Sequence, residues 1–279
     1  MVFPDYDLVI IGTGISIVGQ MTTESLSWIQ RAECFLYAAN DPISEHIVRN
    51  INKGIPTESL NKLYQPGIHR MDIYIEMVEQ IMKNVRAGYK TVVAFYGHPA
   101  VFAYATHKSI AMAQAEGFRA KMLPGISAQD CLFADLAIDP CDFGCNTLEA
   151  TDFLLSRRPI DTSAYLLLWQ IGTLAFNDYD PSGKYDKRAM PLLIEKLSRL
   201  YAPDHEVILY QASTIMGGEP VIKKSLIADL LENEVSVGCT LCIPPFTEVD
   251  VDEEMYNRCL QLFPNKAKPQ KSLPDENKN

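Results

Sequence analysis

Short apolar runs alternate with longer stretches of helical periodicity in the first half of the chain. The runs at 7–11, 34–38 and 91–96 have the length of strands, and each precedes a helix-like segment. In the clearest such segment, 72–86, apolar residues stand at 73, 77, 78, 81 and 85, and Asp72 is expected to cap the helix. This alternation predicts a parallel sheet. Further helices are expected at 22–31, 43–50 and 102–116, and the polar stretch 56–69 is expected to be a loop.

Beyond Pro124 the pattern changes to strands separated by fewer helices. It predicts a second α/β domain with a mixed sheet. The expected strands are 165–170, 206–211, 220–225 and 238–243, and the expected helices are 128–137, 188–201 and 226–231. The predicted organisation is a parallel, Rossmann-like first domain (1–122), a mixed-sheet α/β second domain (123–245), a helical extension (246–264) and a disordered polar tail (265–279).

Composition indicates a soluble enzyme. The 279 residues are 47% hydrophobic, enough for a substantial core, and no apolar run approaches the roughly 18 residues of a membrane span. The first residues contain no signal-peptide core, so we expect a cytoplasmic protein without a membrane partner. A net charge of -10 argues against nucleic acid as a partner.

The cysteines offer a metal hypothesis and an alternative. Cys239 and Cys242 form a CxxC pair, and Cys141 and Cys145 a second, wider pair. No second CxxC or histidine pair completes a zinc set, and 237–243 is typical of a buried strand. We therefore interpret all four as structural cysteines and expect no metal.

Two segments place Pro and Gly between an apolar run and a helix-like run. They are Tyr96-Gly-His-Pro-Ala-Val-Phe102 and Met122-Leu-Pro-Gly-Ile-Ser127. Parallel α/β proteins build ligand loops in this way at the carboxyl ends of strands, and two such loops suggest one cleft. Gly97 permits close approach of backbone to a ligand, and Ser127 is expected to cap the following helix.

Two further patterns are weaker. Gly12-x-Gly14 follows a strand as in dinucleotide-binding turns, but position 17 is Ile, so a tight turn is an equally good interpretation. Tyr64, Arg70 and Tyr74 are spaced by six and four residues. Arg70 and Tyr74 would share a helix face if the helix began slightly before Asp72, although such a pair is usually surface packing.

Together these motifs resemble the tetrapyrrole-methylase superfamily of S-adenosylmethionine (SAM) methyltransferases. The closest resemblance is to the borosin-type peptide backbone α-N-methyltransferases. Gly12, Gly14 and Thr22 match the superfamily's first turn, and Ile15-Ser-Ile-Val18 replaces its Pro-Gly-Asp-Pro as in the borosin branch. Tyr64, Arg70, Tyr74 and Met77 match that branch's Tyr-x5-Arg-x3-Tyr-x2-Met cluster. The resemblance implies a tetrapyrrole-methylase-like α/β fold with a cleft between its two domains.

The resemblance also implies a function and a site. The function is SAM-dependent α-N-methylation of backbone amides in a ribosomal precursor peptide, by a homodimer that needs no metal and releases S-adenosylhomocysteine. Tyr64, Arg70 and Tyr74 are the implied catalytic residues, with the base left open between Tyr74 and Tyr64. The implied cofactor-binding residues are Gly12, Tyr96, Gly97, His98, Val101, Phe102, Ser127, Ala128, Gln170, Tyr210, Ala212, Cys239 and Thr240.

Three alternatives remain open. Fused members of the branch carry an apolar peptide after a clasp segment, whereas this chain ends Ser272-Leu-Pro-Asp-Glu-Asn-Lys-Asn279. We expect a substrate supplied in trans, the alternative being a truncated fused protein. The chain could instead methylate a tetrapyrrole or another small molecule, or be a non-catalytic module that binds peptide or SAM.

Overall fold

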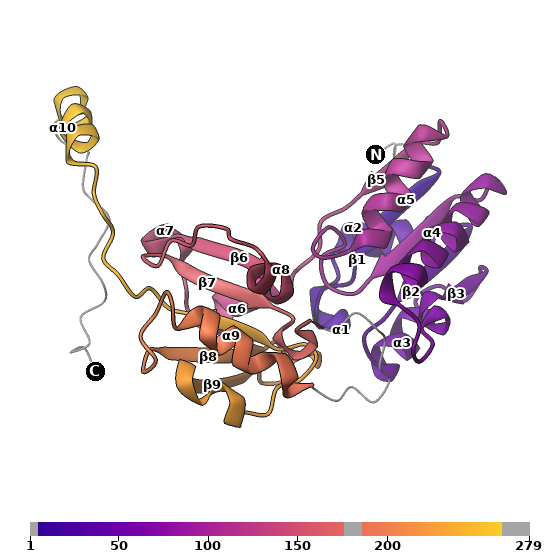
Figure 1. The fold of residues 1–279 in the computed structure, drawn as a ribbon. Helices are drawn as coiled ribbons and strands as arrows, with labels where there is room; N and C mark the ends of the chain where they lie inside the picture. The colour runs from indigo at the N-terminus through magenta and orange to yellow at the C-terminus, as the bar shows by residue number, and fades with distance from the viewer. Residues whose placement is uncertain (1–4, 176–185, 264–279) are drawn as a thin grey trace. The chain divides into compact units, whose positions relative to one another are not determined.

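A computed structural model describes residues 5–175 and 186–263 (Figure 1). The described residues form two compact units: 5–135 with 212–220, and 136–175 with 186–211 and 221–263. The first unit therefore extends beyond residue 122, where the sequence-based division places its boundary. The added residues, 123–135, hold the loop and helix that follow the last strand of the first sheet.

The first unit contains a five-stranded sheet with strand order β3-β2-β4-β1-β5. All four strand pairings are parallel, which confirms the predicted parallel sheet. β3 lies within the stretch expected to be a loop. It consists of three half-buried residues, Thr-Glu-Ser, and so lacks the apolar run from which a strand is predicted. The strands are β1 (Leu8–Gly12), β2 (Cys34–Ala38), β3 (Thr57–Ser59), β4 (Thr91–Phe95) and β5 (Ala120–Met122).

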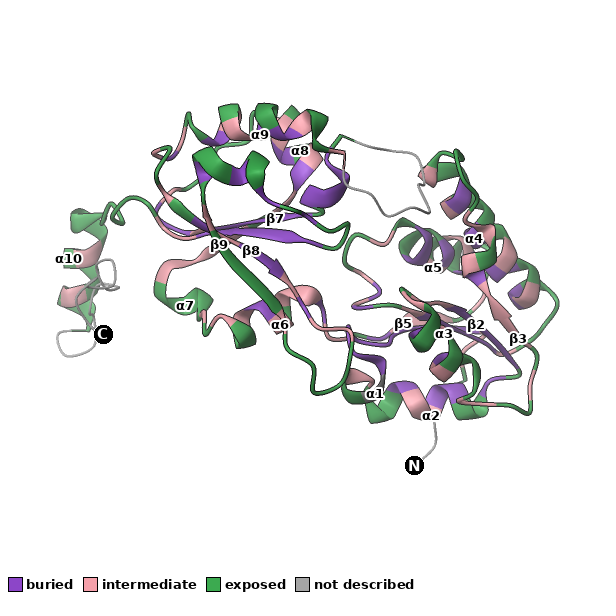
Figure 2. Ribbon diagram, turned by 90° about the horizontal axis from the view of Figure 1, so that it is seen from below, coloured by how far each residue is buried: buried purple, intermediate pink, exposed green. Residues whose placement is uncertain are grey.

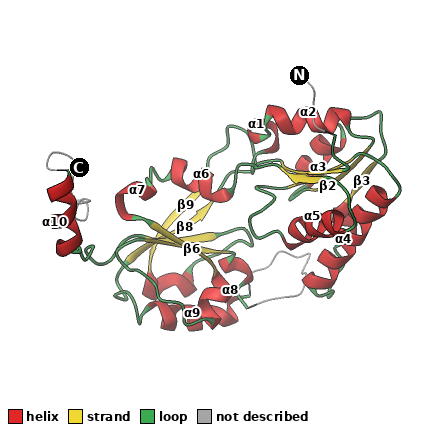
Figure 3. Ribbon diagram, turned by 90° about the horizontal axis from the view of Figure 1, so that it is seen from above, coloured by secondary structure: helices red, strands yellow, loops and turns green. Residues whose placement is uncertain are grey.

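Helices cover both faces of this sheet (Figure 3). Alternate strand residues supply one core with α4 and α5 and another with α2 and α3. Leu8 and Ile10 belong to the first core, whereas Val9 and Ile11 belong to the second. The helices are α1 (Ile17–Gln20), α2 (Thr23–Arg31), α3 (Pro42–Arg49), the 3₁₀ turn η1 (Leu60–Leu63), α4 (Arg70–Arg86), α5 (Tyr104–Ala115) and α6 (Ala128–Asp135).

The start of α4 differs from the sequence prediction. Its N-cap is His69, whose Nδ1 accepts a hydrogen bond from the Met71 amide at 3.3 Å. The predicted cap, Asp72, lies instead in the first turn, where its carboxylate favours the positive end of the helix dipole. The chain turns at Gly67, with φ at +74°, and this early turn lets the helix begin at Arg70.

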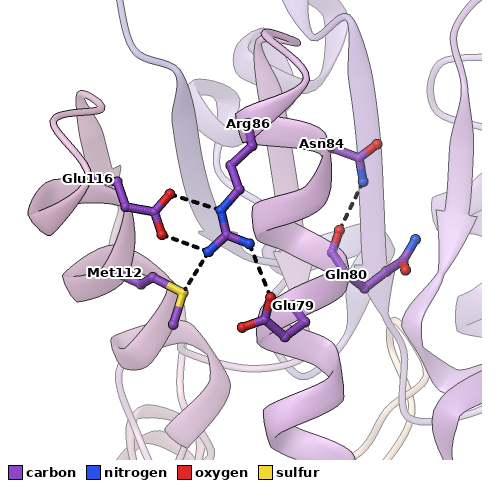
Figure 4. A network of polar contacts seen from close by, with 6 residues as sticks. All are labelled: Glu79, Gln80, Asn84, Arg86, Met112 and Glu116. Atoms are coloured by element: carbon purple, nitrogen blue, oxygen red, sulfur yellow. Dashed lines mark hydrogen bonds and ion pairs between the residues drawn. The ribbon is translucent and has the colours of Figure 1, made fainter.

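The carboxyl-terminal end of α4 is tied to the end of α5 by Arg86 (Figure 4). Its guanidinium donates from Nε and Nη2 to the two oxygens of Glu116, at 2.8 and 2.6 Å, and from Nη1 to Glu79 at 3.1 Å. Hydrogen bonds to Glu116 and Glu79 raise the pKa of Arg86, and the same contact with Arg86 lowers the pKa of Glu116. The bidentate geometry fixes how the two helices lie against each other.

The second unit contains a mixed sheet with strand order β6-β7-β10-β8-β9. β6 and β7 are parallel, and the other three pairings are antiparallel, which confirms the predicted mixed sheet. β6 was not expected, because its sequence Cys-Asn-Thr-Leu-Glu is mostly polar. The strands are β6 (Cys145–Glu149), β7 (Tyr165–Trp169), β8 (Glu206–Gln211), β9 (Val221–Leu226) and β10 (Thr240–Ile243).

One core holds this unit together. Leu166, Leu168, Leu209 and Leu241 from the strands pack against helical residues such as Leu193. The segment expected as a helix at 226–231 is a 3₁₀ turn. The helical elements are α7 (Pro140–Phe143), α8 (Ala150–Leu155), η2 (Ile171–Thr173), η3 (Lys187–Ala189), α9 (Met190–Leu197), η4 (Ile227–Glu232) and α10 (Glu253–Leu262).

The predicted helix in the extension is present as α10, and none of its residues is buried. The tail predicted to be disordered, 265–279, lies outside the described residues. Among the described helices, none combines the length and the apolar character that crossing a bilayer requires.

Neighbouring isoleucines on α4 test which face carries the first core. Ile73 is 1% exposed and Ile75 is 48% exposed. We expect Ile73→Ala to lower the free energy of unfolding by about 2–5 kcal/mol, because it leaves a cavity beneath the sheet. Ile75→Ala, the matched control, should change it by about 0.5 kcal/mol or less. Urea unfolding followed by circular dichroism measures both; equal losses would contradict the assignment of faces.

Candidate functional site

Three loops meet backbone to backbone at the carboxyl edge of the first sheet. Gly12 ends β1, Gly97 follows β4 and Gly125 follows β5. A Cβ atom at Gly12 would lie 2.4 Å from the Gly97 carbonyl oxygen and 3.0 Å from the Gly125 Cα. A Cβ atom at Gly125 would lie 2.8 Å from the same oxygen. These distances leave no room for a side chain, so glycine at 12 and 125 is a condition of the three loops meeting.

Hydrogen bonds join the first two of these loops. The Gly97 amide donates to the Gly14 carbonyl at 3.0 Å, and the Gly14 amide donates to the Gly97 carbonyl at 3.3 Å. Both glycines have positive φ, +73° at Gly14 and +71° at Gly97, a conformation that L-residues seldom adopt. The two turns therefore hold each other in place through this pair of hydrogen bonds.

Gln20 fills the inside of the turn after β1. Its side-chain oxygen accepts hydrogen bonds from the amides of Ile15 and Ser16 at 2.8 and 2.9 Å. Its side-chain nitrogen lies 3.4 Å from the Cys131 sulfur on α6. In dinucleotide-binding turns, backbone amides at this place bind the pyrophosphate. Here a neutral side chain already takes two of them, so the Gly12-x-Gly14 motif serves as a tight turn.

The loop after β4, residues 96–102, has an internally bonded backbone and an exposed apolar surface. His98 Nδ1 accepts from the Ala100 amide at 3.0 Å, and Thr106 donates to the Pro99 carbonyl at 2.5 Å. His98 thus positions the loop in this structure. Val101 and Phe102 are 44% and 51% exposed, and Phe102 has φ at +50°.

Tyr96 begins this loop, and its phenol lies among polar groups. Burial raises the pKa of Tyr96 to about 12, with smaller contributions from the neighbouring Cys131 and Asp41, while a hydrogen bond with Asn40 lowers it. The residue as a whole keeps 38% of its surface exposed. At neutral pH the hydroxyl keeps its proton and can donate a hydrogen bond.

The second Gly/Pro loop ends at α6 as predicted. Ser127 Oγ accepts from the Asp130 amide at 3.2 Å and donates to the Asp130 carboxylate at 2.7 Å. The Ser127 amide also donates to that carboxylate at 2.7 Å. This reciprocal pattern is a capping box, which confirms Ser127 as the N-cap of the helix that begins at Ala128.

Tyr64, Arg70 and Tyr74 lie near the same edge of the sheet. Tyr64 ends η1, which follows the carboxyl end of β3, and Arg70 is the first residue of α4. Because α4 begins at Arg70, that residue and Tyr74 are four apart on one helix face, as the spacing required. Tyr64 and Tyr74 both pack, half-buried, against the core that α4 shares with the sheet.

An asparagine connects η1 to the strand next to it. The Asn61 side chain accepts from the Ala39 amide at 3.0 Å and donates to the Ala39 carbonyl at 2.5 Å, just beyond the end of β2. Asn40, the next residue, bonds Tyr96. Hydrogen bonds therefore connect neighbouring segments along the carboxyl end of the sheet. They run from η1, next to Tyr64, through the residues after β2 to the loop after β4.

The remaining predicted residues belong mainly to the second unit. Tyr210 pairs with Thr240 in the antiparallel ladder, and the Ile171 amide, next to Gln170, donates to the Cys239 carbonyl at 3.3 Å. Gln170, Tyr210, Cys239 and Thr240 therefore share one end of the second sheet. Ala212 groups with the first unit instead.

Cys239 and Cys242 are buried thiols of this second sheet. Burial raises the pKa of Cys239 to about 11 and that of Cys242 to about 12, which disfavours the thiolate that metal binding and redox exchange need. Within residues 5–175 and 186–263, no three metal-ligating side chains cluster.

Sequence reasoning did not assign roles to Gln20, Asn40, Asn61 or Cys131. The stretch 12–20 resembles a Gly-Thr-Gly-x4-Gly-Gln turn of the borosin branch, which ends on a glutamine at position 20, so part of the signal was present. Asn40 lies in the loop after β2 and Asn61 lies in η1, and only the fold shows that they bond Tyr96 and the Ala39 backbone.

Comparison with known proteins places this geometry in a family. The sequence profile of the tetrapyrrole (corrin/porphyrin) methylases matches residues 7–228. The chain is 40% identical over 268 residues to the methyltransferase/ribosomally synthesized cyclic peptide dendrothelin A precursor of Dendrothele bispora (strain CBS 962.96), covering 95% of this chain and 63% of that protein. It is 39% identical to the omphalotin A precursor of Omphalotus olearius, with the same coverage.

A further relative carries the name of the borosin class. The chain is 38% identical over 255 residues to the methyltransferase/ribosomally synthesized type I borosin cyclic peptide precursor of Gymnopilus junonius, covering 90% of this chain and 60% of that protein. The chain thus spans less than two thirds of the length of these three relatives.

Solved structures confirm the predicted tetrapyrrole-methylase-like α/β fold. Cobalt precorrin-4 methyltransferase matches with a TM-score of 0.58 at 17% identity, covering 85% of this chain and 94% of its own. Uroporphyrin-III-C-methyltransferase from Thermus thermophilus matches with a TM-score of 0.58 at 15% identity, covering 85% and 91%. The profile match over 7–228 and this fold together show that the chain belongs to the tetrapyrrole (corrin/porphyrin) methylases.

Proposed function

We propose that this chain transfers a methyl group from SAM to backbone amide nitrogens of a ribosomally made precursor peptide supplied in trans. One observation carries the proposal: Tyr64, Arg70 and Tyr74 share a sheet edge with the Gly/Pro loops. The names of relatives at 38–40% identity, methyltransferases joined to cyclic peptide precursors, support the substrate class.

The first-unit edge suits a cofactor without phosphate. SAM has a sulfonium, an adenosine and an amino-acid group but no phosphate, and Gln20 already occupies the turn amides that would bind one. The exposed surfaces of Val101 and Phe102 suit an adenosyl or thioether group. When bound, SAM supplies the electrophilic methyl group.

The cofactor-binding residues implied by the resemblance are carried over as a proposal, with each unit taken by itself. In the first unit they are Gly12, the loop 96–102, Ser127, Ala128 and Ala212. In the second they are Gln170, Tyr210, Cys239 and Thr240, which share one end of its sheet. Tyr96 would act there as a hydrogen-bond donor, since its pKa is about 12.

The substrate sets the chemical problem. The lone pair of an amide nitrogen is delocalised into the carbonyl, so the nitrogen is a poor nucleophile until it loses its proton. A tyrosine in its phenolate form that accepts this proton, directly or through water, would make methyl transfer feasible. Negative charge would then develop on the amide oxygen, and a fixed cation would stabilise it.

Tyr64, Arg70 and Tyr74 match these needs. Among the described residues, no carboxylate pairs with Arg70, so its charge is available to an amide oxygen. Tyr74 lies one turn further along the same helix face, and Tyr64 lies at the end of η1. We assign proton acceptance to one of the two tyrosines, which as a phenolate would take the amide proton and become a phenol, and charge stabilisation to Arg70. Alignment of nitrogen, methyl and sulfur supplies the rest.

The proposal includes a cytoplasmic homodimer that uses no metal. The exposed apolar residues of α10 support the dimer: Met255, Leu262 and Phe263, in and just after the helix, are 50%, 73% and 57% exposed. An amphipathic helix that buries none of its residues in its own chain suits a subunit contact.

SAM and S-adenosylhomocysteine should bind without added metal. Gly97→Ala should weaken SAM binding by about tenfold or more, because a side chain would enter the turn that approaches the ligand. Gly88→Ala is the matched control, since Gly88 also has positive φ, at +88°, but ends α4 in open space. Calorimetry in the presence of a chelator measures both; no SAM binding by the unaltered chain, or binding only with zinc, would refute the cofactor.

Arg70→Ala and Tyr74→Phe should slow methylation on the order of 100- to 1000-fold while SAM affinity stays within about twofold. The readout is the mass added to a peptide: the part of the dendrothelin A precursor relative that lies outside its match to this chain. Tyr89→Phe is the control, because Tyr89 is an exposed tyrosine that precedes β4 at its amino end. Lost SAM binding with normal turnover at saturation would place these residues on the cofactor side.

The chain should sediment as a dimer at micromolar concentration. Replacing Met255 and Leu262 together by Ser should shift it toward monomer, because both side chains leave apolar surface exposed on α10. The control is Leu155→Ser, at a residue 77% exposed on α8. A monomeric unaltered chain would rule out the dimer.

A further inference from the structure

β9 is an edge strand whose outer side is unpaired in the described part of the chain. It is the last strand of the second sheet and pairs only with β8, from Glu206↔Leu226 to Gln211↔Val221. Figure 2 shows the strand exposed along most of its length, and Val221 and Ile222 are 59% and 45% exposed. Free N–H and C=O groups along such an edge are a template for another strand.

The two faces of β9 differ in chemistry. Directly paired residues share a face, so Lys223 lies on the side of its partner Leu209, which belongs to the core beneath α9. Ile222, Lys224 and Leu226 point to the opposite side. Lys224 is paired with Glu206 at 2.7 Å, whereas Lys223 has no ion-pair partner among residues 5–175 and 186–263. The edge therefore offers one unneutralised cation on one face and apolar side chains on the other.

The segment that leaves β10 has a complementary pattern. Residues 248–252 read Glu-Val-Asp-Val-Asp, a strict alternation of acidic and β-branched residues that is typical of a strand. In this chain they form no strand, and Val249 and Val251 are 40% and 37% exposed. If extended, the segment would present three carboxylates on one face and two valines on the other.

We propose that residues 248–252 of a second copy of this chain add to β9 as an antiparallel sixth strand. Asp250 then lies opposite Lys223 on one face, and Val251 lies opposite Ile222 on the other, which gives one charge pair and one apolar pair. In the same register Val249 lies opposite Lys224, which Glu206 already neutralises, and Asp252 lies opposite Val221. The exchange is reciprocal in a two-fold dimer, which closes the assembly. This inference rests on the homodimer proposed above and adds the contact that forms it.

The segment cannot reach β9 of its own chain. The amides of Phe246 and Thr247 both donate to the Thr162 carbonyl, at 2.8 and 3.2 Å, just before the start of β7. β10 and β8 separate β7 from β9, so at about 4.8 Å per strand the outer edge of β9 is roughly 19 Å from β7. One residue, the step from Thr247 to Glu248, spans only about 3.8 Å. The strand must therefore come from a partner chain.

Disulfide trapping tests the contact directly. In a background with the exposed Cys141 and Cys259 replaced by Ser, chains carrying Lys223→Cys are mixed with differently sized chains carrying Asp250→Cys. Because residues opposite each other on neighbouring strands are close enough for a disulfide, we expect a cross-linked heterodimer in the mixture. Neither chain alone should give it. Lys108→Cys, at an exposed residue of α5, replaces Lys223→Cys in the control and should give none with Asp250→Cys.

Charge reversal supplies a second readout by sedimentation. Lys223→Glu should weaken dimerisation by about threefold to tenfold, and adding Asp250→Lys should restore it, while the control Lys108→Glu leaves it unchanged. A dimer with no cross-link and no charge effect would overturn the strand exchange and leave the dimer standing. A cross-link within single monomeric chains that carry both cysteines would also overturn it. A monomeric unaltered chain would overturn both proposals.

Discussion

Backbone contact among three glycine-containing loops is the constraint on which the first unit's edge depends. Gly12, Gly97 and Gly125 come from the ends of β1, β4 and β5, and a Cβ atom at Gly12 or Gly125 would lie under 3 Å from the Gly97 carbonyl oxygen. Interiors pack too tightly to absorb such an overlap without moving backbone. Because the loops meet there, the segment 96–102 and the N-terminus of α6 lie on either side of one point. The side chains and backbone groups of these two segments are therefore the ones that a ligand bound at this point would meet.

Gln20 occupies backbone donors of the turn after β1. A loop of amides at a strand end would otherwise attract an anion, but the carboxamide oxygen accepts two of those hydrogen bonds without adding charge. Its nitrogen reaches Cys131, so the turn and α6 are held by the same side chain. A turn built in this way leaves the neighbouring loop, with Val101 and Phe102, as the surface open to a ligand. A half-buried neutral side chain therefore stands where a phosphate group would otherwise meet these amides.

The sequence predicted the elements that carry an apolar signal and missed those that do not. β1, β2, β4 and β7 are apolar runs, whereas Thr-Glu-Ser in β3 and Cys-Asn-Thr-Leu-Glu in β6 gain their strand conformation from pairing with a neighbour. The capping role of Ser127 was predictable because it is local. The bonds of Gln20 to Cys131 and of Asn61 to Ala39 depend on side-chain direction and on residues far along the chain, which spacing does not encode. The catalytic and cofactor assignments came from resemblance and stay predictions.

The second sheet has an edge whose composition is unusual for a protein that remains alone. Edge strands are commonly protected by charge, and β9 has two lysines, but Glu206 neutralises Lys224, and Val221 and Ile222 stay exposed beside Lys223. In the segment 248–252, Val249 and Val251 are exposed, whereas Asp252 caps α10. Phe246 and Thr247 hold this segment at the far side of the sheet. Each feature alone would favour association with something. The outer edge of β9 and the segment 248–252 occur in one molecule and carry complementary charges, which favours their association with each other. Because the segment is held next to Thr162, the proposed pairing joins two different copies of the chain.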